Sequence, residues 1–284
     1  MHLIWPTDGT PVARRALPFI SLLCRSAFDR VTVTSVDEPR YMDVTRSLMG
    51  ARPAPDGRTE NALHLAEQMQ AVEGLPGRLE GVPLAGLAGA EIVGLAERLR
   101  PDLIVMGDGQ HAARRMLLGS TSRFVARHAP SSVLVVRHER VPRSILVADD
   151  GSADVRAALP LLHRLGPPGA TRVRVVRVVR EAPRGRGLGG LADATSHDAR
   201  LVLAALREDY RDAGLSGVTS VVLRGNPWAR LRVEIAKTQP DLIVVGAAGA
   251  RAIRMVPGGV SDRILRKTHA SVLIARQHRP AAGG

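Results

Sequence analysis

The sequence predicts an α/β protein made of two tandem doubly wound domains, each with a five-stranded parallel sheet flanked by about four helices. The first observation behind this prediction is an internal repeat. LIWPTDGTPVARRAL, which starts at Leu3, returns as ILVADDGSADVRAAL, which starts at Ile145. PDLIVMG at Pro101 returns as PDLIVVG at Pro240, and two further blocks recur in the same order. Because such a repeat marks a duplicated structural unit, we expect one domain in residues 1–140 and a second in residues 141–284.

The second observation is that short runs rich in Val, Ile and Leu alternate with helical patterns. In the first repeat the runs are Leu3–Pro6, Val31–Val36, Arg78–Val82, Asp102–Met106 and Ser132–Arg137. In the second repeat they are Ile145–Ala148, Arg172–Val179, Thr219–Leu223, Asp241–Val245 and Ser271–Ala275. Amphipathic stretches such as Ala90–Arg100 and Ala194–Gly214 lie between them. Continuous apolar strands that alternate with helices are typical of a parallel sheet covered on both faces.

Three segments of the sequence read as connections. His138–Pro142 is a short polar link between the repeats. Met49–Gly57 and Ala182–Gly190 follow the second strand of each repeat and are rich in Gly, Pro and Arg. This composition does not suit a core and predicts surface loops.

Composition excludes several classes of protein. The 284 residues are 45% hydrophobic and 24% charged, as in ordinary globular proteins. The single cysteine, Cys24, has no disulfide partner in the chain and lies on an apolar helical pattern, so we expect it in the core. No apolar run reaches the ~20 residues that span a bilayer, and no signal-peptide pattern opens the sequence. We therefore expect a cytoplasmic protein with no membrane partner.

The positive charge does not by itself predict nucleic-acid binding. The chain has 40 Lys and Arg against 27 Asp and Glu, which gives a net charge of +13. Lys occurs only at 237 and 267, and the many arginines are spread along the whole sequence. Aromatic residues make up 2% of the chain, too few for the base-stacking surfaces of single-strand binders. Specific nucleic-acid binding is not predicted.

Ligands of open parallel sheets bind beyond the carboxyl ends of the strands, so the residues there are the informative ones. The first strand ends at Pro6 and is followed by Asp8, and the second repeat has Asp150 at the same place. Asp followed by Gly and Ser or Thr is also typical of a helix cap or a turn. A binding role and a purely structural role both remain open for these carboxylates.

A second element follows the fourth strand. In the first repeat it contains Met106, Gly107, Gly109, Gly119, Ser120 and Thr121, and in the second it contains Gly246, Gly249, Gly258 and Ser261. Glycines let the backbone approach a ligand closely, and a helix N-terminus offers unpaired N–H groups and a positive dipole end. The pattern indicates an anion site. The alternative is a loop and a capped helix without a ligand.

These motifs together resemble the universal stress protein family. The resemblance rests on Gly-x-x-Gly, nine residues and Gly-Ser/Thr, together with the PTDGT start and the RHAPSSVLVV ending, and it covers essentially the whole chain. It implies a sheet order of 3-2-1-4-5, adenine nucleotide binding in one subgroup and pairing through the fifth strands. Both repeats depart from the pattern. Met106 stands at the first glycine position, and eight residues instead of nine separate Gly249 from Gly258.

The resemblance assigns ATP, with Mg²⁺ on its phosphate oxygens, chiefly to the first repeat. Asp8 and Val36 would hold the adenosine end. Backbone N–H groups of Gly107, Gly109, Gly119 and Ser120 would hold the phosphates. The second repeat offers Asp150, Val178 and its glycines as a degenerate counterpart. The alternative is a scaffold that binds protein partners and no nucleotide.

No enzyme motif points to catalysis, since GxxxxGK[ST], GxSxG and a GxGxxG after the first strand do not occur. We expect no catalytic residue and at most weak ATP hydrolysis. His111, His128 and His269 stand alone in the sequence. The last strands of the two repeats are apolar and would lie at sheet edges, which invite pairing. We expect them to pair with each other in an internal pseudo-dimer, and a further homodimer remains open.

Overall fold

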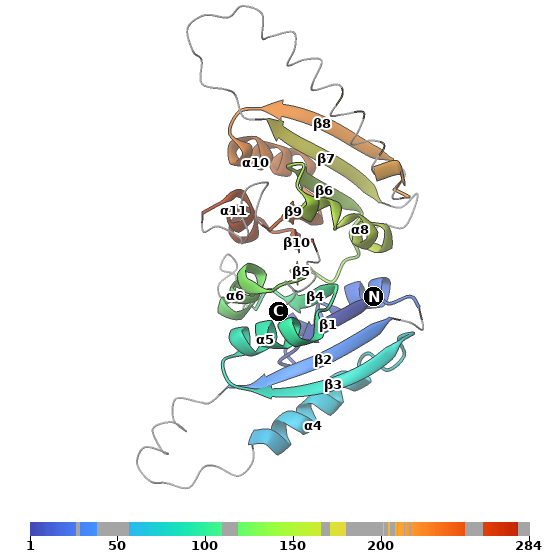
Figure 1. Cartoon of the computed structure of the whole chain (residues 1–284), viewed down its shortest axis with the longest axis vertical. Helices are drawn as coiled ribbons and strands as arrows, with labels where there is room; N and C mark the ends of the chain where they lie inside the picture. The colour runs from blue at the N-terminus through green and yellow to red at the C-terminus, as the bar shows by residue number, and fades with distance from the viewer. Residues whose placement is uncertain are drawn as a thin grey trace, which may run out of the picture. The chain divides into compact units, whose positions relative to one another are not determined.

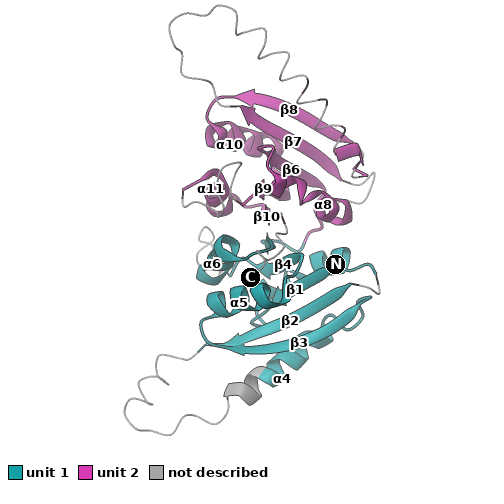
Figure 2. Ribbon diagram, viewed as in Figure 1, with its two compact units in different colours: residues 1–139, 278–284 teal, residues 140–277 magenta. Residues whose placement is uncertain are grey.

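The computed structural model describes residues 1–26, 29–38, 57–109, 119–165, 171–179, 201, 204, 208, 210–212, 214–215, 217–247 and 258–277. The chain divides into two compact units, of which unit 1 contains Met1–Glu139 and unit 2 contains Arg140–Gln277 (Figure 2). Of the predicted loops Met49–Gly57 and Ala182–Gly190, residues 49–56 and 182–190 lie outside the described residues, while Gly57 begins a helix and is not part of a loop. Within the described part of the chain, no helix has both the length and the apolar character needed to cross a bilayer.

Unit 1 is built on five parallel strands. They are β1 (His2–Pro6), β2 (Arg30–Asp37), β3 (Arg78–Ala85), β4 (Leu103–Gly107) and β5 (Ser132–Val136). Their order is β3-β2-β1-β4-β5, so the direction of strand addition reverses between β1 and β4 (Figure 1). The order 3-2-1-4-5 implied by the family resemblance is confirmed.

The strands form because their residues suit a sheet that is buried on both sides. Every residue of β4 and β5 is buried, and Leu3, Ile4 and Trp5 of β1 are fully buried. β3 is the outer strand and is more exposed, and it runs three residues beyond the predicted Val82, through Pro83. A proline has no N–H to donate, which is tolerated in an outer strand but not in a central one.

The helices of unit 1 are α1 (Pro11–Arg14), α2 (Leu17–Leu23), α4 (Gly57–Gln70), α5 (Ala88–Leu99) and α6 (Ser120–His128). Right-handed crossovers place α1, α2 and α4 on one face of the sheet and α5 and α6 on the other. Thr10 begins α1, because its hydroxyl accepts from Ala13 N at 3.3 Å. Arg100 ends α5 in the left-handed conformation, with φ 47°.

The core of unit 1 lies between the sheet and these helices. Trp5 and Phe19 are its largest fully buried side chains, and the Trp5 Nε1–H donates to Ala13 O at 3.4 Å. Cys24 is 1% exposed, and its thiol donates to Pro76 O at 2.6 Å. The expectation that this cysteine is a core residue is confirmed.

Unit 2 repeats the same plan. Its strands are β6 (Ser144–Asp149), β7 (Arg172–Val179), β8 (Val218–Arg224), β9 (Leu242–Gly246) and β10 (Ser271–Ala275), in the order β10-β9-β6-β7-β8. Its helices include α7 (Ala153–Arg156), α8 (Leu159–Leu165), α10 (Pro227–Thr238) and α11 (Val260–Lys267). Most of the predicted helix Ala194–Gly214 lies outside the described residues.

Candidate functional site

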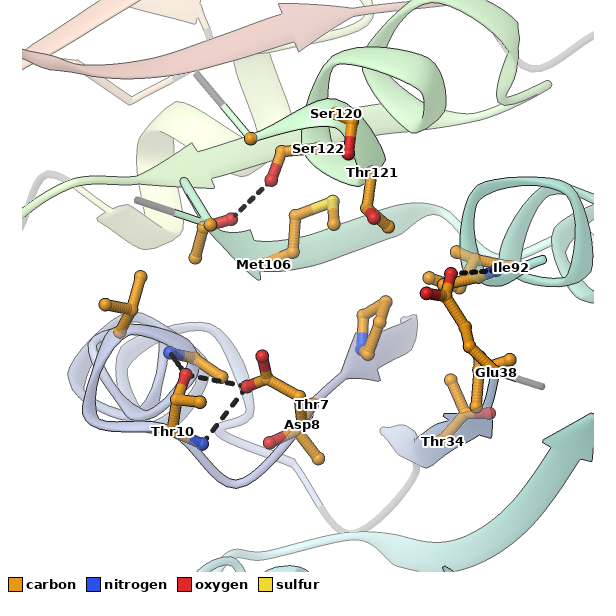
Figure 3. Close-up of a pocket in the computed structure, with 18 residues that line it drawn as sticks. Thr7, Asp8, Thr10, Thr34, Glu38, Ile92, Met106, Ser120, Thr121 and Ser122 are labelled. Atoms are coloured by element: carbon orange, nitrogen blue, oxygen red, sulfur yellow. Dashed lines mark hydrogen bonds between the residues drawn. The ribbon is translucent and has the colours of Figure 1, made fainter. Parts of the chain in front are cut away.

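A pocket of about 390 Å³ lies where the strand order of unit 1 reverses, at the carboxyl ends of β1, β2 and β4 (Figure 3). Its lining residues are Pro6, Thr7, Asp8, Thr10, Val12, Ala13, Thr34, Val36, Glu38, Ala88, Ile92, Met106, Gly107, Gly109, Gly119, Ser120, Thr121 and Ser122. This is the place where open parallel sheets bind ligands. The nine residues that the sequence predicts as ligand-binding in the first repeat all line this one pocket: Pro6, Asp8, Val36, Met106, Gly107, Gly109, Gly119, Ser120 and Thr121.

The turn after β1 holds Asp8 at the rim. Asp8 Oδ1 accepts from Thr10 N at 3.1 Å and from Thr10 Oγ1 at 2.7 Å (Figure 3). Gly9 N donates to Thr7 Oγ1 at 3.1 Å. Gly9 has φ +70°, and a Cβ there would collide with the His64 ring of α4. Asp8 thus has the turn role that its sequence pattern allows. Oδ2, which takes no part in these bonds, is left as an acceptor.

The glycines after β4 bring two backbone segments into contact. Gly109 has φ +69°, and a Cβ added to Gly119 would lie 3.0 Å from both the Asp108 carbonyl oxygen and Gly109 Cα. A Cβ at Gly107 would collide with the Val12 carbonyl. The three glycines are therefore needed for close packing at the pocket floor.

One detail differs from the expectation for this loop. The Gly119 N–H donates to Asp108 O at 2.8 Å, so it is engaged within the protein rather than available to a phosphate. Gly119 still lines the pocket, as the N-cap residue of α6. The donors there come from the next residues, because the first N–H groups of a helix have no intrahelical acceptor.

The start of α6 is fixed by a buried hydroxyl. Ser122 Oγ donates to Gly107 O at 2.9 Å, and this side chain is 1% exposed. The bond joins the first turn of the helix to the end of β4. It leaves Ser120 and Thr121, which follow the cap, facing the pocket with the positive end of the helix dipole.

The opposite wall consists of β2 and α5. Thr34 and Val36 lie on the same side of β2, as the two-residue period of a strand requires. Glu38 Oε1 accepts from Ala88 N at 2.8 Å and so caps α5 (Figure 3). Thr34 could have been found from the strand period. Glu38 continues this period just beyond the end of β2 and could have been found in the same way. Ala88 and Ile92 reach the pocket only through the packing of α5, which leaves no signal in the sequence.

In unit 2 the corresponding residues have different partners. Ser261 Oγ donates to Gly246 O at 2.6 Å, which makes Ser261 the counterpart of the buried Ser122 and places Gly259 at the position of Ser120. Gly258 N donates to the Asp262 carboxylate at 3.0 Å. Unit 2 therefore lacks a hydroxyl at the first position of its helix.

Other predicted residues of unit 2 keep only part of the pattern. Asp150 Oδ1 accepts from Ser152 N at 2.9 Å, as Asp8 does from Thr10, and Val178 belongs to β7. Asp149, beside Asp150, forms an ion pair with Arg177 at 2.8 Å. Gly249 lies outside the described residues.

One solved structure agrees with this architecture over nearly the whole chain. A universal stress protein of Archaeoglobus fulgidus DSM 4304 aligns over 97% of this chain and 98% of its own, with a TM-score of 0.67 and 19% identity, which shows the fold. A solved universal stress protein in complex with cAMP aligns over 48% of this chain and 99% of its own, with a TM-score of 0.37 and 19% identity.

A putative universal stress protein of Staphylococcus haemolyticus (strain JCSC1435) is 49% identical over 49 residues. The match spans 17% of this chain and 30% of the relative, so less than a third of that curated protein is covered. The model of the universal stress protein family matches residues 1–137 and, a second time, residues 142–276. The chain therefore belongs to the universal stress protein family and carries two family domains in tandem.

Proposed function

We propose that unit 1 binds an adenine nucleotide, ATP, in the pocket between β1, β2, β4 and α6, and that the protein acts in the stress response through this binding rather than through catalysis. The observation that carries the proposal is the convergence of the nine predicted residues of the first repeat on one pocket. A volume of about 390 Å³ lies within the range of small-molecule sites.

The polarity of the pocket suits a nucleotide. The acceptors Asp8 and Glu38 lie on the β1 and β2 side, where an adenosine could donate from its amino and hydroxyl groups. Val36 and Ile92 supply apolar surface for a base. Across the pocket, the N–H groups and hydroxyls of Ser120 and Thr121 at the start of α6 would receive the phosphates.

Mg²⁺ would enter with the nucleotide. This ion binds through one or two anionic groups and keeps several of its waters, so phosphate oxygens are sufficient ligands. The role of the chain is then to hold the phosphate oxygens in place from α6 and the glycine turn.

A second candidate function applies to unit 2. The missing hydroxyl at Gly259 favours a domain that binds no nucleotide and serves as a scaffold for a protein partner. On this view the chain binds one nucleotide, in unit 1.

Isothermal titration of the full chain with ATP tests both statements. We expect saturable binding of one ATP per chain. Asp8→Ala should weaken binding about tenfold, the equivalent of one lost hydrogen bond to a charged group. Asp150→Ala is the matched control, because it removes the same turn bond in unit 2 and should leave ATP affinity unchanged.

Two results would contradict this assignment. The absence of saturable heat, together with no rise in melting temperature at excess ATP, would leave the scaffold function for both units. A stoichiometry of two, with Asp150→Ala as damaging as Asp8→Ala, would show that unit 2 also binds ATP.

A further inference from the structure

A buried carboxylate adjoins the glycine turn without reaching the pocket. Asp108 stands between Gly107 and Gly109, and its side chain is 7% exposed. Its Oδ1 lies 3.7 Å from Arg15 Nη1, and its Oδ2 lies 3.9 Å from Arg137 Nε. Arg15 Nη1 also donates to Arg137 O at 3.3 Å. The three side chains therefore connect the ends of α1, β4 and β5.

The backbone of Asp108 makes two further connections. Its N–H donates to Val136 O of β5 at 3.1 Å, and its carbonyl accepts from Gly119 N at 2.8 Å. Gly107, Gly109 and Gly119 all line the pocket. A movement of Asp108 would consequently move the phosphate side of the pocket as a whole.

Asp108 and Arg137 interact more strongly than surface charges would, because both side chains are shielded from water. Burial lowers the pKa of the Arg137 guanidinium, and the Asp108 carboxylate opposes that shift. A buried charge is costly without a partner, so Asp108 and Arg137 depend on each other.

In unit 2 the turn after the fourth strand of the repeat, β9, has no carboxylate at the position of Asp108. The sequence repeat places Ala247 at the position of Asp108 and Ala157 at the position of Arg15. Arg276 takes the place of Arg137, and its charged neighbour is Asp154 in the first turn of α7. Burial lowers the pKa of Arg276 to about 10, and the Asp154 carboxylate opposes the shift. Asp154 Oδ1 also accepts from Gln277 N at 3.0 Å. An arginine after the last strand has a carboxylate nearby in both units, but only unit 1 takes that carboxylate from the glycine turn.

We propose that the Asp108 carboxylate is a positioning group for the phosphate half of the unit 1 pocket, where its contacts with Arg15 and Arg137 hold the Gly107–Gly109 turn against Gly119. The inference rests on the proposed nucleotide binding in unit 1. It assigns to Asp108 a function that the shape of the pocket alone does not reveal, because the side chain is not part of the lining.

The test uses Asp108→Asn in the full chain, with ATP and adenosine titrated separately. Asn keeps the size of the side chain and removes its charge. We expect the Kd for ATP to rise about tenfold, because the turn loses both of its ion pairs, and the Kd for adenosine to change less than twofold. In the ligand-free protein, the Gly119 amide hydrogen should exchange faster, as measured by NMR.

Asp154→Asn is the matched control, because it removes the carboxylate near the equivalent arginine of unit 2. It should change neither ATP affinity nor Gly119 exchange. If Asp108→Asn does not fold, Arg15→Met replaces it, because the Arg15 side chain is 35% exposed and its loss is tolerated more easily. This variant should raise the Kd for ATP about threefold, with adenosine again unchanged.

The outcomes separate this inference from the proposed function. Equal weakening of ATP and adenosine, or wild-type values for both ATP affinity and Gly119 exchange, would overturn the positioning function. If the wild-type chain binds no ATP, the proposed function fails. Gly119 exchange then decides by itself whether Asp108 holds the turn, with wild-type exchange in Asp108→Asn counting against it.

Discussion

Single residues set the shape of the unit 1 pocket, and Gly9 is the clearest case. Its φ of +70° lies in the left-handed region, and a Cβ would collide with the His64 ring. The same turn presents Asp8, whose Oδ1 accepts two hydrogen bonds from Thr10. The backbone conformation of one glycine thus decides where a pocket carboxylate stands.

Gly9→Ala should therefore destabilise the protein. We expect a loss of about 1–2 kcal/mol for the left-handed conformation, and more if the His64 ring must move. Gly94→Ala on α5 is the control, because only the end of the Arg98 side chain comes near, at 3.8 Å. It should stabilise the helix by about 0.5–1 kcal/mol. Urea unfolding measures both variants, and equal effects would contradict the explanation.

Pocket-lining residues whose chemistry is local could be predicted from the sequence. Asp8 and Gly109 were predicted because a strand end followed by Asp-Gly or by spaced glycines has few conformations. Ile92 could not be predicted, because it lines the pocket only through the packing of α5 opposite β2, whereas Glu38 continues the two-residue period of Thr34 and Val36 and was within reach of the same reasoning. Ser261 is predicted as a ligand residue, whereas its hydroxyl donates to Gly246 O. That bond depends on how the helix meets the strand, and the residue spacing does not reveal it.

Among the elements, the strands were the easiest to predict. A central strand such as β4 is buried along its whole length, so its sequence is an uninterrupted apolar run. The exposed β3 was predicted three residues too short, because Pro83 reads as the end of a strand. Because β3 lies at the edge of the sheet, it can contain a proline, and this position is set by the tertiary structure and not by the local sequence.

The first strand also carries a group that responds to pH. His2 Nε2 lies 2.9 Å from Thr32 Oγ1, and burial, followed by the charge of Arg30, lowers the pKa of His2 below its usual 6.5. Asp102 and Glu80 oppose this shift. At pH values between the folded and unfolded pKa of His2, the unfolded chain binds more protons than the folded chain. The neutral His2 therefore contributes to the free energy of unfolding above about pH 6.5, and this contribution is lost as the pH falls.

We expect His2→Gln to lose less stability between pH 7.5 and pH 5 than the wild type does. Glutamine retains a donor for Thr32 and does not titrate. Urea midpoints at the two pH values measure the difference. Identical losses in both proteins would show that other groups account for the acid sensitivity.

The whole molecule contributes through its net charge of +13. A cationic protein attracts anions over distances that depend on the Debye length, about 10 Å at 0.1 M salt and 3 Å at 1 M. This field acts on a phosphate chain and not on a neutral nucleoside. It adds to the local donors at the start of α6 without changing which residues touch the ligand.

ATP affinity should accordingly fall as salt rises. We expect the Kd for ATP to rise several-fold between 50 mM and 500 mM NaCl, with adenosine affinity nearly constant. Titration calorimetry at both salt concentrations tests this. A salt dependence shared equally by adenosine would point to a general effect on the protein rather than on the anionic ligand.

Pro83 has a consequence for how the molecule behaves at high concentration. An outer strand with free N–H and C=O groups is a template on which another chain can add a strand and begin a fibril. In β3 the proline removes one donor from that row, and its ring obstructs an incoming backbone. Pro83, the residue that makes β3 look shorter in the sequence than it is, thus protects this side of unit 1 from edge-to-edge aggregation.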